Sequence, residues 1–206
     1  EMLKGATNYI VAQDNTTLRY DGNITQTGTN TNGANLIVGL PTIDGTVILN
    51  GTNDYTGFTR IQNGATLSVR LLANGGTASG IGASASAATN LVLNGGTLAY
   101  TGGAVSTDRL FSLGNQGGTI DSSGTGALDF TNTGTIGYNG ATGVRTLTLT
   151  GATGGSLAMV IGDNTGSTSL TKSGAGTWTL TASSTYTGDT TIAAGALRIG
   201  ADANIG

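Results

Sequence analysis

The side chains of this chain best suited to acid–base chemistry are its carboxylates. There are eleven Asp and Glu residues and eight Lys and Arg residues, with no cysteine and no histidine. Without these two residue types, the usual catalytic triads, thiol chemistry, disulfides and common zinc sites are excluded. One enzyme hypothesis remains, a polysaccharide-cleaving site made of aspartates on a β-helix. Its candidates are Asp121 and Asp129, and Asp108 beside Arg109.

No pair of these carboxylates has a spacing that places them opposite each other for acid–base catalysis, although stacked coils could bring distant residues together. We therefore expect solvated loop or turn residues and no enzyme. The turn Gly162-Asp163-Asn164 offers too few oxygen ligands to hold calcium unaided, and the Gly-Gly-x-Gly-x-Asp repeat of calcium β-rolls is absent. The sequence predicts no metal and no cofactor.

Composition and charge indicate an elongated, repetitive protein. Of 206 residues 37 are glycine, and only 9% are charged, against about 25% in an ordinary soluble domain. Leu, Ile and Val recur in short alternating runs, which favours order, and their thin, even distribution favours a fold in which each segment packs on its neighbours. The net charge of −3, with basic residues scattered along the chain, argues against nucleic acid as a partner.

No segment has the length and apolarity of a membrane helix, and the start of the chain lacks a signal-peptide core. We expect the chain to lie inside a longer polypeptide.

The local pattern is that of short strands separated by tight turns. Alternation of apolar residues with threonine has the period of a half-buried strand. Asn-Gly pairs between the runs tolerate the positive φ that tight turns require. The small-residue run Ala83–Ala88 is interpreted as coil. Examples of the expected strands are Leu91–Leu93, Thr97–Tyr100, Ala127–Phe130, Arg145–Leu149 and Thr177–Leu180.

A long internal repeat organises the chain. The segment from Gly45 to Ala65 returns, without a gap, 131 residues later from Gly176 to Ala196. A segment ending in Ile-Gly follows each copy. The structural repeat positions are Gly45, Leu49, Tyr55, Gly57, Ile61 and Gly64 in the first copy, and Gly176, Leu180, Tyr186, Gly188, Ile192 and Gly195 in the second.

A looser, finer period predicts stacked coils. Gly-Thr or Gly-Ala followed by an alternating strand recurs at spacings that suit coils of about 20 residues with two or three strands each. Nine or ten such coils, about 4.8 Å apart, would form a rod about 45 Å long. The expected fold is all-β, a right-handed parallel β-helix (solenoid) with three short strands per coil, and with Leu, Ile and Val inside.

The second copy, from Gly174 to Gly200, resembles the passenger-associated transport repeat, also called the autotransporter-associated β-strand repeat. It matches the family's Gly-x-Gly-Thr-Leu-x-Leu, Tyr-Thr-Gly-x-Thr-x-Ile and Gly-x-Leu-x-Ile-Gly elements, with Trp178 in place of the first leucine. The first copy departs at Phe58 and carries one extra residue before Leu67. The stretch Leu91–Ile136 resembles the spacer that accompanies such repeats.

The resemblance implies a type V secretion passenger on a Gram-negative cell surface or in the medium, folding outside the cell as a β-helical stalk. We expect one continuous β-helix over 1–206, with repeats at 45–69 and 176–200 and spacer coils over 83–175. The expected function is a scaffold of an adhesin-like passenger. Alternatives are a fibre- or biofilm-forming subunit and a carbohydrate-active enzyme.

Possible partners are neighbouring repeats of the same chain, further copies through lateral or end-to-end contacts, and a host-surface or polysaccharide ligand. Tyr55 and Tyr186 could line a sugar- or partner-binding face, but we expect each to pack a coil at a turn. Trp178 occupies the position of Val47 in the repeat, which indicates a strand-face residue more than a unique site.

Overall fold

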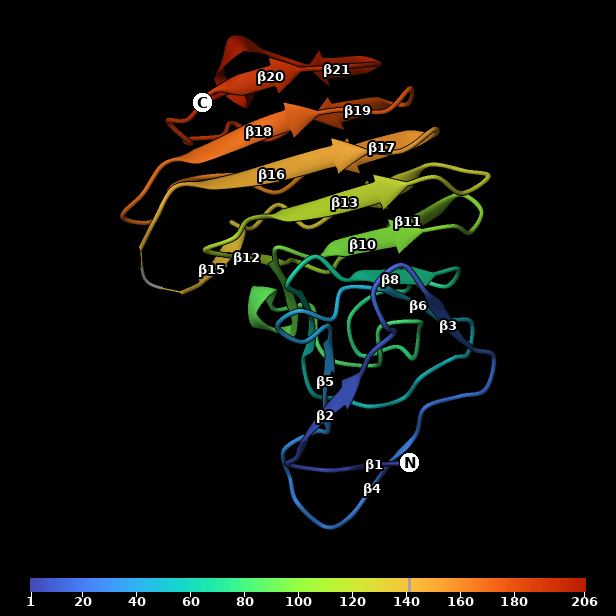
Figure 1. Ribbon diagram of the computed structural model, residues 1–206. Helices are drawn as coiled ribbons and strands as arrows, with labels where there is room; N and C mark the ends of the chain where they lie inside the picture. Colours follow the sequence, from blue (N-terminus) through green and yellow to red (C-terminus); the bar gives the residue numbers. More distant parts are fainter. Residues whose placement is uncertain (141) are drawn as a thin grey trace.

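The computed structural model describes residues 1–140 and 142–206, and these residues form stacked parallel strands with very little helix. Figure 1 shows the strands of the largest sheet stacked one above another, with β20 and β21 at the C-terminal end. We call the three long sheets I, II and III. Sheet I contains, in spatial order, β3 (Thr17–Tyr20), β6 (Thr46–Leu49), β8 (Thr66–Val69), β10 (Thr97–Tyr100), β13 (Gly118–Ser122), β16 (Arg145–Thr150), β18 (Thr168–Lys172) and β20 (Thr190–Ile192).

The other two long sheets are shorter than sheet I. Sheet II contains β2 (Thr7–Ile10), β5 (Asn35–Val38), β7 (Thr59–Gln62), β9 (Leu91–Asn94), β12 (Ser112–Gly114) and β15 (Gly137–Asn139). Sheet III contains β11 (Val105–Thr107), β14 (Leu128–Phe130), β17 (Gly154–Leu157), β19 (Thr177–Leu180) and β21 (Ala196–Ile199). A separate pair, β1 (Met2–Leu3) and β4 (Gln26–Thr27), lies near the N-terminus, and two short 3-10 turns are η1 (Ala88–Asn90) and η2 (Asp202–Asn204).

The chain visits the sheets in the order II, I, III, and each strand pairs in parallel with a strand of the next coil. This arrangement confirms the expected parallel β-helix. Three strands per coil occur in the coils β9-β10-β11, β12-β13-β14 and β15-β16-β17, whereas the coils on either side have two. The expectation of three strands in every coil therefore needs correction, because turns or loops replace the third strand there.

Coil length varies more than the sequence pattern suggests. Partner residues on sheet I are 20 positions apart between Thr46 and Thr66, but 31 apart between Thr66 and Thr97. The long coil includes the irregular segment 70–87, which contains most of Ala83–Ala88; Ala88 itself begins η1. Because some coils are longer than expected, the chain forms fewer of them. Sheet I has eight strands in the described residues, one per coil, where the sequence predicted nine or ten coils. Seven steps of about 4.8 Å give a stack of about 34 Å.

The apolar core is a set of columns that run along the stack. On sheet I, Val47, Leu67, Leu98 and Ile120 occupy successive positions of one inward column, and all four are buried. Phe111 and Phe130 meet edge to face inside the coil, with ring centroids 5.8 Å apart. Burial of apolar area at about 25 cal/mol per Å² makes such columns the main stabilising contribution.

Three of the eight cations lie inside the molecule without a carboxylate partner. Lys172 falls in the inward column of sheet I, and its Nζ bends to a corner, where it donates to the carbonyls of Ser173, Gly174 (2.8 Å) and Ala194 (3.0 Å). The Arg145 guanidinium is also buried; it donates to backbone carbonyls and lies 4.8 Å from the ring centroid of Tyr138. Scattered basic residues thus act partly as internal hydrogen-bond donors.

Arg109 is the third buried cation and orders the segment 70–87. Its guanidinium donates to the carbonyls of Ala73, Thr77, Gly82 and Ser84, at 2.9–3.2 Å. A buried carbonyl that accepts no hydrogen bond lowers the stability of the fold. In this irregular segment the Arg109 guanidinium donates the hydrogen bonds that strand amides donate elsewhere.

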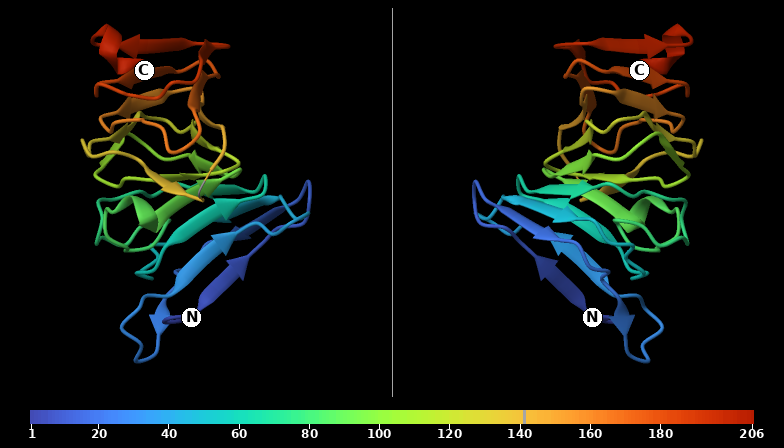
Figure 2. Two further views of the ribbon diagram at one scale, coloured as in Figure 1. Left: turned by 90° about the vertical axis from the view of Figure 1, so that its left-hand side faces the viewer. Right: turned by 90° about the vertical axis from the view of Figure 1, so that its right-hand side faces the viewer.

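Figure 2 shows that the N-terminal strands run obliquely to the strands stacked above them. The stack is therefore not straight at its N-terminal end (Figures 1 and 2).

Close contact between coils predicts a strong effect of adding a single methyl group at Gly151. This glycine has φ +111°, and a Cβ there would lie 2.2 Å from the Ser122 carbonyl oxygen of the preceding coil. We expect Gly151→Ala to lower the free energy of unfolding by at least about 1–3 kcal/mol, measured by urea denaturation. The control is Gly103→Ala, because no atom lies within 4 Å of a Cβ at Gly103. Equal stability of the two variants would contradict the prediction.

Candidate functional site

The carboxylates considered for catalysis lie on different faces of the solenoid. Asp121 is in β13 of sheet I and accepts a hydrogen bond from Ser123 Oγ. Asp129 is in β14 of sheet III and accepts one from Ser156 Oγ at 2.6 Å. Each carboxylate thus has a serine donor on its own face, and the structure does not bring the two together.

Asp108 and Arg109 are adjacent in sequence but serve separate purposes. Asp108 Oδ1 accepts a hydrogen bond from the Gly75 amide at 2.7 Å, whereas Arg109 is buried among carbonyls as described above. Burial lowers the pKa of Arg109, and the nearby Tyr55 and Asp108 oppose that effect. Both residues hold the segment 70–87 in place.

The turn considered for calcium is satisfied by protein donors. Asp163 accepts hydrogen bonds from the Thr168 amide at 2.6 Å, and from the Thr187 amide at 2.9 Å and hydroxyl at 2.7 Å. Partial burial by itself would raise its pKa, but the hydrogen bonds from Thr187 and Thr168 outweigh that effect and hold the pKa below the ordinary value of 3.8. Among the described residues, no group of three or more acidic side chains gathers as a metal-binding cluster.

Both repeat copies contain the same buried tyrosine corner. Tyr55 and Tyr186 are fully buried, and their hydroxyls form hydrogen bonds with Thr59 Oγ1 at 2.8 Å and Thr190 Oγ1 at 2.7 Å. Burial raises the pKa of Tyr55. In these positions the two tyrosines join a loop to the following strand and present no ring to a ligand. Sequence equivalence suggested a common role, but not the threonine partner four residues on.

Further contacts recur in both copies. The Asn53 amide donates to the Ser79 carbonyl at 2.9 Å, and the Ser184 amide donates to the Ala203 carbonyl at 2.7 Å. Gly57 and Gly188 each donate a backbone hydrogen bond to the preceding coil, at 3.1 and 3.0 Å. A Cβ at either glycine would lie within 2.4 Å of a carbonyl oxygen of that coil, so the two positions cannot accommodate a side chain. The loop after each copy thus closes the same corner.

The two copies nevertheless occupy different faces. In the first, β6 and β8 belong to sheet I and β7 to sheet II; in the second, β19 and β21 belong to sheet III and β20 to sheet I. The motif therefore specifies one coil with a corner, and does not specify a face. The chain passes through the faces in the order II, I, III. The first copy begins on sheet I with β6 and the second begins one face later, on sheet III, with β19. Val47 and Trp178 accordingly point inward on sheets I and III, and both are buried.

The outer face of sheet I carries a threonine ladder, one residue per coil. Its members are exposed at the two ends and half-buried between them, and none is charged. Strand register aligns its members, each of which pairs with the next along the stack, and the alternate positions of the same strands point inward. The members are Thr17, Thr46, Thr66, Thr97, Thr119, Thr148, Thr171 and Thr191.

Comparison with known proteins identifies the same repeat. The family model of the passenger-associated transport repeat matches residues 44–69 and 170–199. Over 138 residues, which are 65% of this chain, the sequence is 49% identical to the adhesin BmaC autotransporter of Brucella suis biovar 1 (strain 1330). The chain spans only 4% of the length of that relative. No solved structure matches the chain. No helix in the described residues is long and apolar enough to cross a membrane.

The hydrogen bonds to Asp163 predict a pH-dependent contribution to stability. Because its folded-state pKa is lowered, this contribution is fully present above the unfolded value near 3.8 and is lost as pH falls through the folded pKa. We expect Asp163→Asn to cost about 1 kcal/mol at pH 7 and less at pH 2.5, from urea denaturation at both values. Asp202→Asn, on the exposed η2 turn, is the control. A cost for Asp163→Asn that is the same at both pH values would contradict this role.

Proposed function

Because this chain is autotransporter passenger sequence carrying passenger-associated transport repeats, we propose that it is a scaffold segment of an adhesin-like passenger on a Gram-negative cell surface. The observation that carries the proposal is the unbroken parallel pairing of sheet I from β3 to β20, in which every coil is hydrogen-bonded to the next. Such a stack resists bending and keeps whatever lies beyond it at a distance from the membrane. The relative's name, an adhesin, supports the setting.

We propose that the chain has no catalytic activity of its own, because Asp121 and Asp129 lie on separate sheets and each accepts a hydrogen bond from a serine, while Asp108 accepts one from the Gly75 amide. We also propose that residues 1–206 form one continuous β-helix within a longer passenger, with transport repeats at 45–69 and 176–200 and spacer coils over 83–175. The conserved geometry of the two tyrosine corners supports treating the repeats as structural units.

The scaffold role is tested by inserting the chain between a surface anchor and an epitope on Gram-negative cells. The intact chain should make the epitope accessible to a bulky antibody, measured by flow cytometry. Tyr55→Ala removes a buried ring and should cost about 3–5 kcal/mol of stability, so it should reduce antibody binding at equal expression. Tyr9→Ala, which removes an exposed ring on β2, is the control. Equal accessibility without the chain would count against a spacing role.

A second candidate function, self-association, is favoured by the threonine ladder. Two copies of this chain have the same spacing of one threonine per coil, so hydroxyls on one ladder can meet hydroxyls on the other along several coils. Each hydroxyl both donates and accepts, and the net worth of one such bond is only about 0.5–1.5 kcal/mol. Association through this face would thus be weak for one segment and stronger for cells that display many.

Cell clustering tests this candidate. Cells displaying the chain should aggregate, and Thr148→Arg, in the middle of the ladder, should abolish aggregation through charge repulsion between identical faces. Thr179→Arg, an outward position of sheet III in register with Ser156, adds the same charge on another face and should leave aggregation unchanged. Clustering that is insensitive to Thr148→Arg, or no clustering at all, would rule out this use of sheet I.

A further inference from the structure

A polar groove lies where strands of sheet I end and the chain turns toward the next face. It has a volume of about 550 Å³ and is lined mainly by Arg19, Asn50, Arg70, Leu71, Thr101 and Thr125. We call it the corner groove. Asn50, Arg70 and Thr101 directly follow β6, β8 and β10, so three successive coils each contribute one polar side chain. The solenoid's repeat thus places a row of polar groups along this corner.

The corner groove has an unusual charge for this molecule. With Arg109, Arg145 and Lys172 buried, five basic side chains remain at the surface beside eleven acidic residues. Two of those five, Arg19 and Arg70, line the corner groove. The surface is therefore more acidic than the net charge of −3 suggests, and the groove is one of its few basic places.

Arg19 is held in a defined orientation. Its Nε donates to both carboxylate oxygens of Asp21, at 2.9 and 3.0 Å, and Asn50 Nδ2 donates to Asp21 Oδ1 at 2.6 Å. The hydrogen bonds from Arg19 and Asn50 lower the pKa of Asp21. Because these bonds use only Nε of Arg19, its two terminal nitrogens are available to a ligand.

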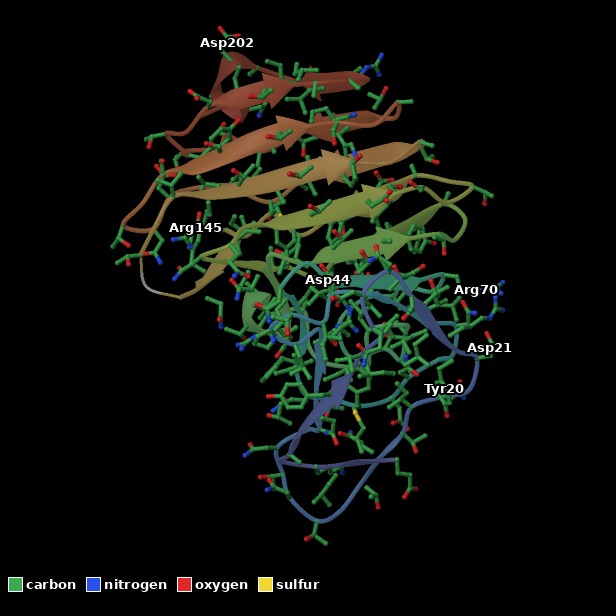
Figure 3. The ribbon with its side chains drawn as sticks, viewed as in Figure 1. Tyr20, Asp21, Asp44, Arg70, Arg145 and Asp202 are labelled. Carbon is green, nitrogen blue, oxygen red and sulfur yellow. The ribbon has the colours of Figure 1, made fainter. Side chains whose placement is uncertain are left out.

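Arg70 is the uncommitted charge of the cluster. Its guanidinium makes no hydrogen bond or ion pair within the described part of the chain, and it acts on Asp21 only through its field. Figure 3 shows Arg70 and Asp21 on the same flank of the molecule. Asp21 offsets one of the two arginine charges, which leaves a net charge of one positive unit with two guanidinium groups facing a polar floor.

We propose that the corner groove binds an anionic oligosaccharide, with a carboxylate or sulfate of the sugar held between Arg70 and the terminal nitrogens of Arg19. Guanidinium groups recognise such planar or multi-oxygen anions through paired hydrogen bonds. The hydroxyls of Thr101 and Thr125 and the amide oxygen of Asn50 lie along the groove for sugar hydroxyls. Leu71, which is 42% exposed, offers an apolar contact for the carbon face of a sugar ring.

Arginine clusters also bind acidic peptides, but the threonine hydroxyls, the Asn50 amide and the exposed Leu71 of this groove suit the hydroxyls and carbon face of a sugar, so we favour a saccharide. This binding site goes beyond the scaffold role: a stack that spaces other domains needs no ligand, whereas this corner would give the stack an affinity of its own.

Titration of the purified 206-residue chain with defined oligosaccharides tests the proposal. The probes are an oligogalacturonate hexamer, which carries carboxylates, a heparin hexasaccharide, which carries sulfates, and a neutral dextran oligomer of equal length. The experiment uses isothermal titration calorimetry at low salt, since the Debye length is about 10 Å at 0.1 M. We expect one or both anionic probes to bind and dextran not to bind; the preferred anionic probe identifies which group is recognised.

Arg70→Ala should weaken binding of the anionic probe at least fivefold, and Arg70→Lys should restore part of the affinity. The matched control is Arg198→Ala, which removes an exposed arginine from β21 on sheet III and should change affinity less than twofold. Absence of binding by both anionic probes overturns the proposal. So does an equal loss from Arg198→Ala, or equal binding of a single-stranded oligonucleotide of the same charge, since either shows non-selective attraction. The display experiment does not depend on these results.

Discussion

The parallel backbone pairing between one coil and the next is the interaction on which every other feature of this molecule depends. Side chains of one coil meet those of its neighbours only because the strands of sheets I, II and III are in register. Register aligns the inward leucines, isoleucines and valines into columns, and the same register aligns outward threonines into a ladder. Where a coil is too long for the ladder, as over 70–87, a buried arginine supplies donors in place of strand amides. Close backbone approach then explains why glycine is needed at corners such as Gly57 and Gly188.

Buried cations alter how the charge of this chain is interpreted. Arg109, Arg145 and Lys172 are buried, and backbone carbonyls, not carboxylates, stabilise them by accepting their hydrogen bonds. Their number makes the surface more acidic than the sequence total, so the few exposed arginines stand out. Arg19 and Arg70 are far apart in sequence. Coil stacking brings them together, because Arg19 lies on β3 and Arg70 directly follows β8 at the same corner of the solenoid.

Short alternating runs and the 131-residue repeat were enough to predict the all-β class, the parallel β-helix and individual strands such as β9, β10 and β19. Strand number per coil and coil length could not be predicted, because a loop and a third strand can span the same face with similar composition. Sequence equivalence identified Tyr55 and Tyr186 as counterparts, but the faces on which they lie depend on the number of coils between them. The inward position of Lys172 could not be predicted for a related reason: it depends on the pairing of Lys172 with Leu149 on the neighbouring strand.

The advance of the second repeat by one face has a consequence for valency. From β6 to β19 the chain completes five coils and one further face, a rise of about 26 Å at 4.8 Å per coil. A tandem array of this unit would return to its starting orientation only after three units, or about 77 Å. Any patch fixed to one side of the unit would then recur at three angles around the axis. Such an array would meet a neighbouring surface with equivalent patches from whichever side it approached.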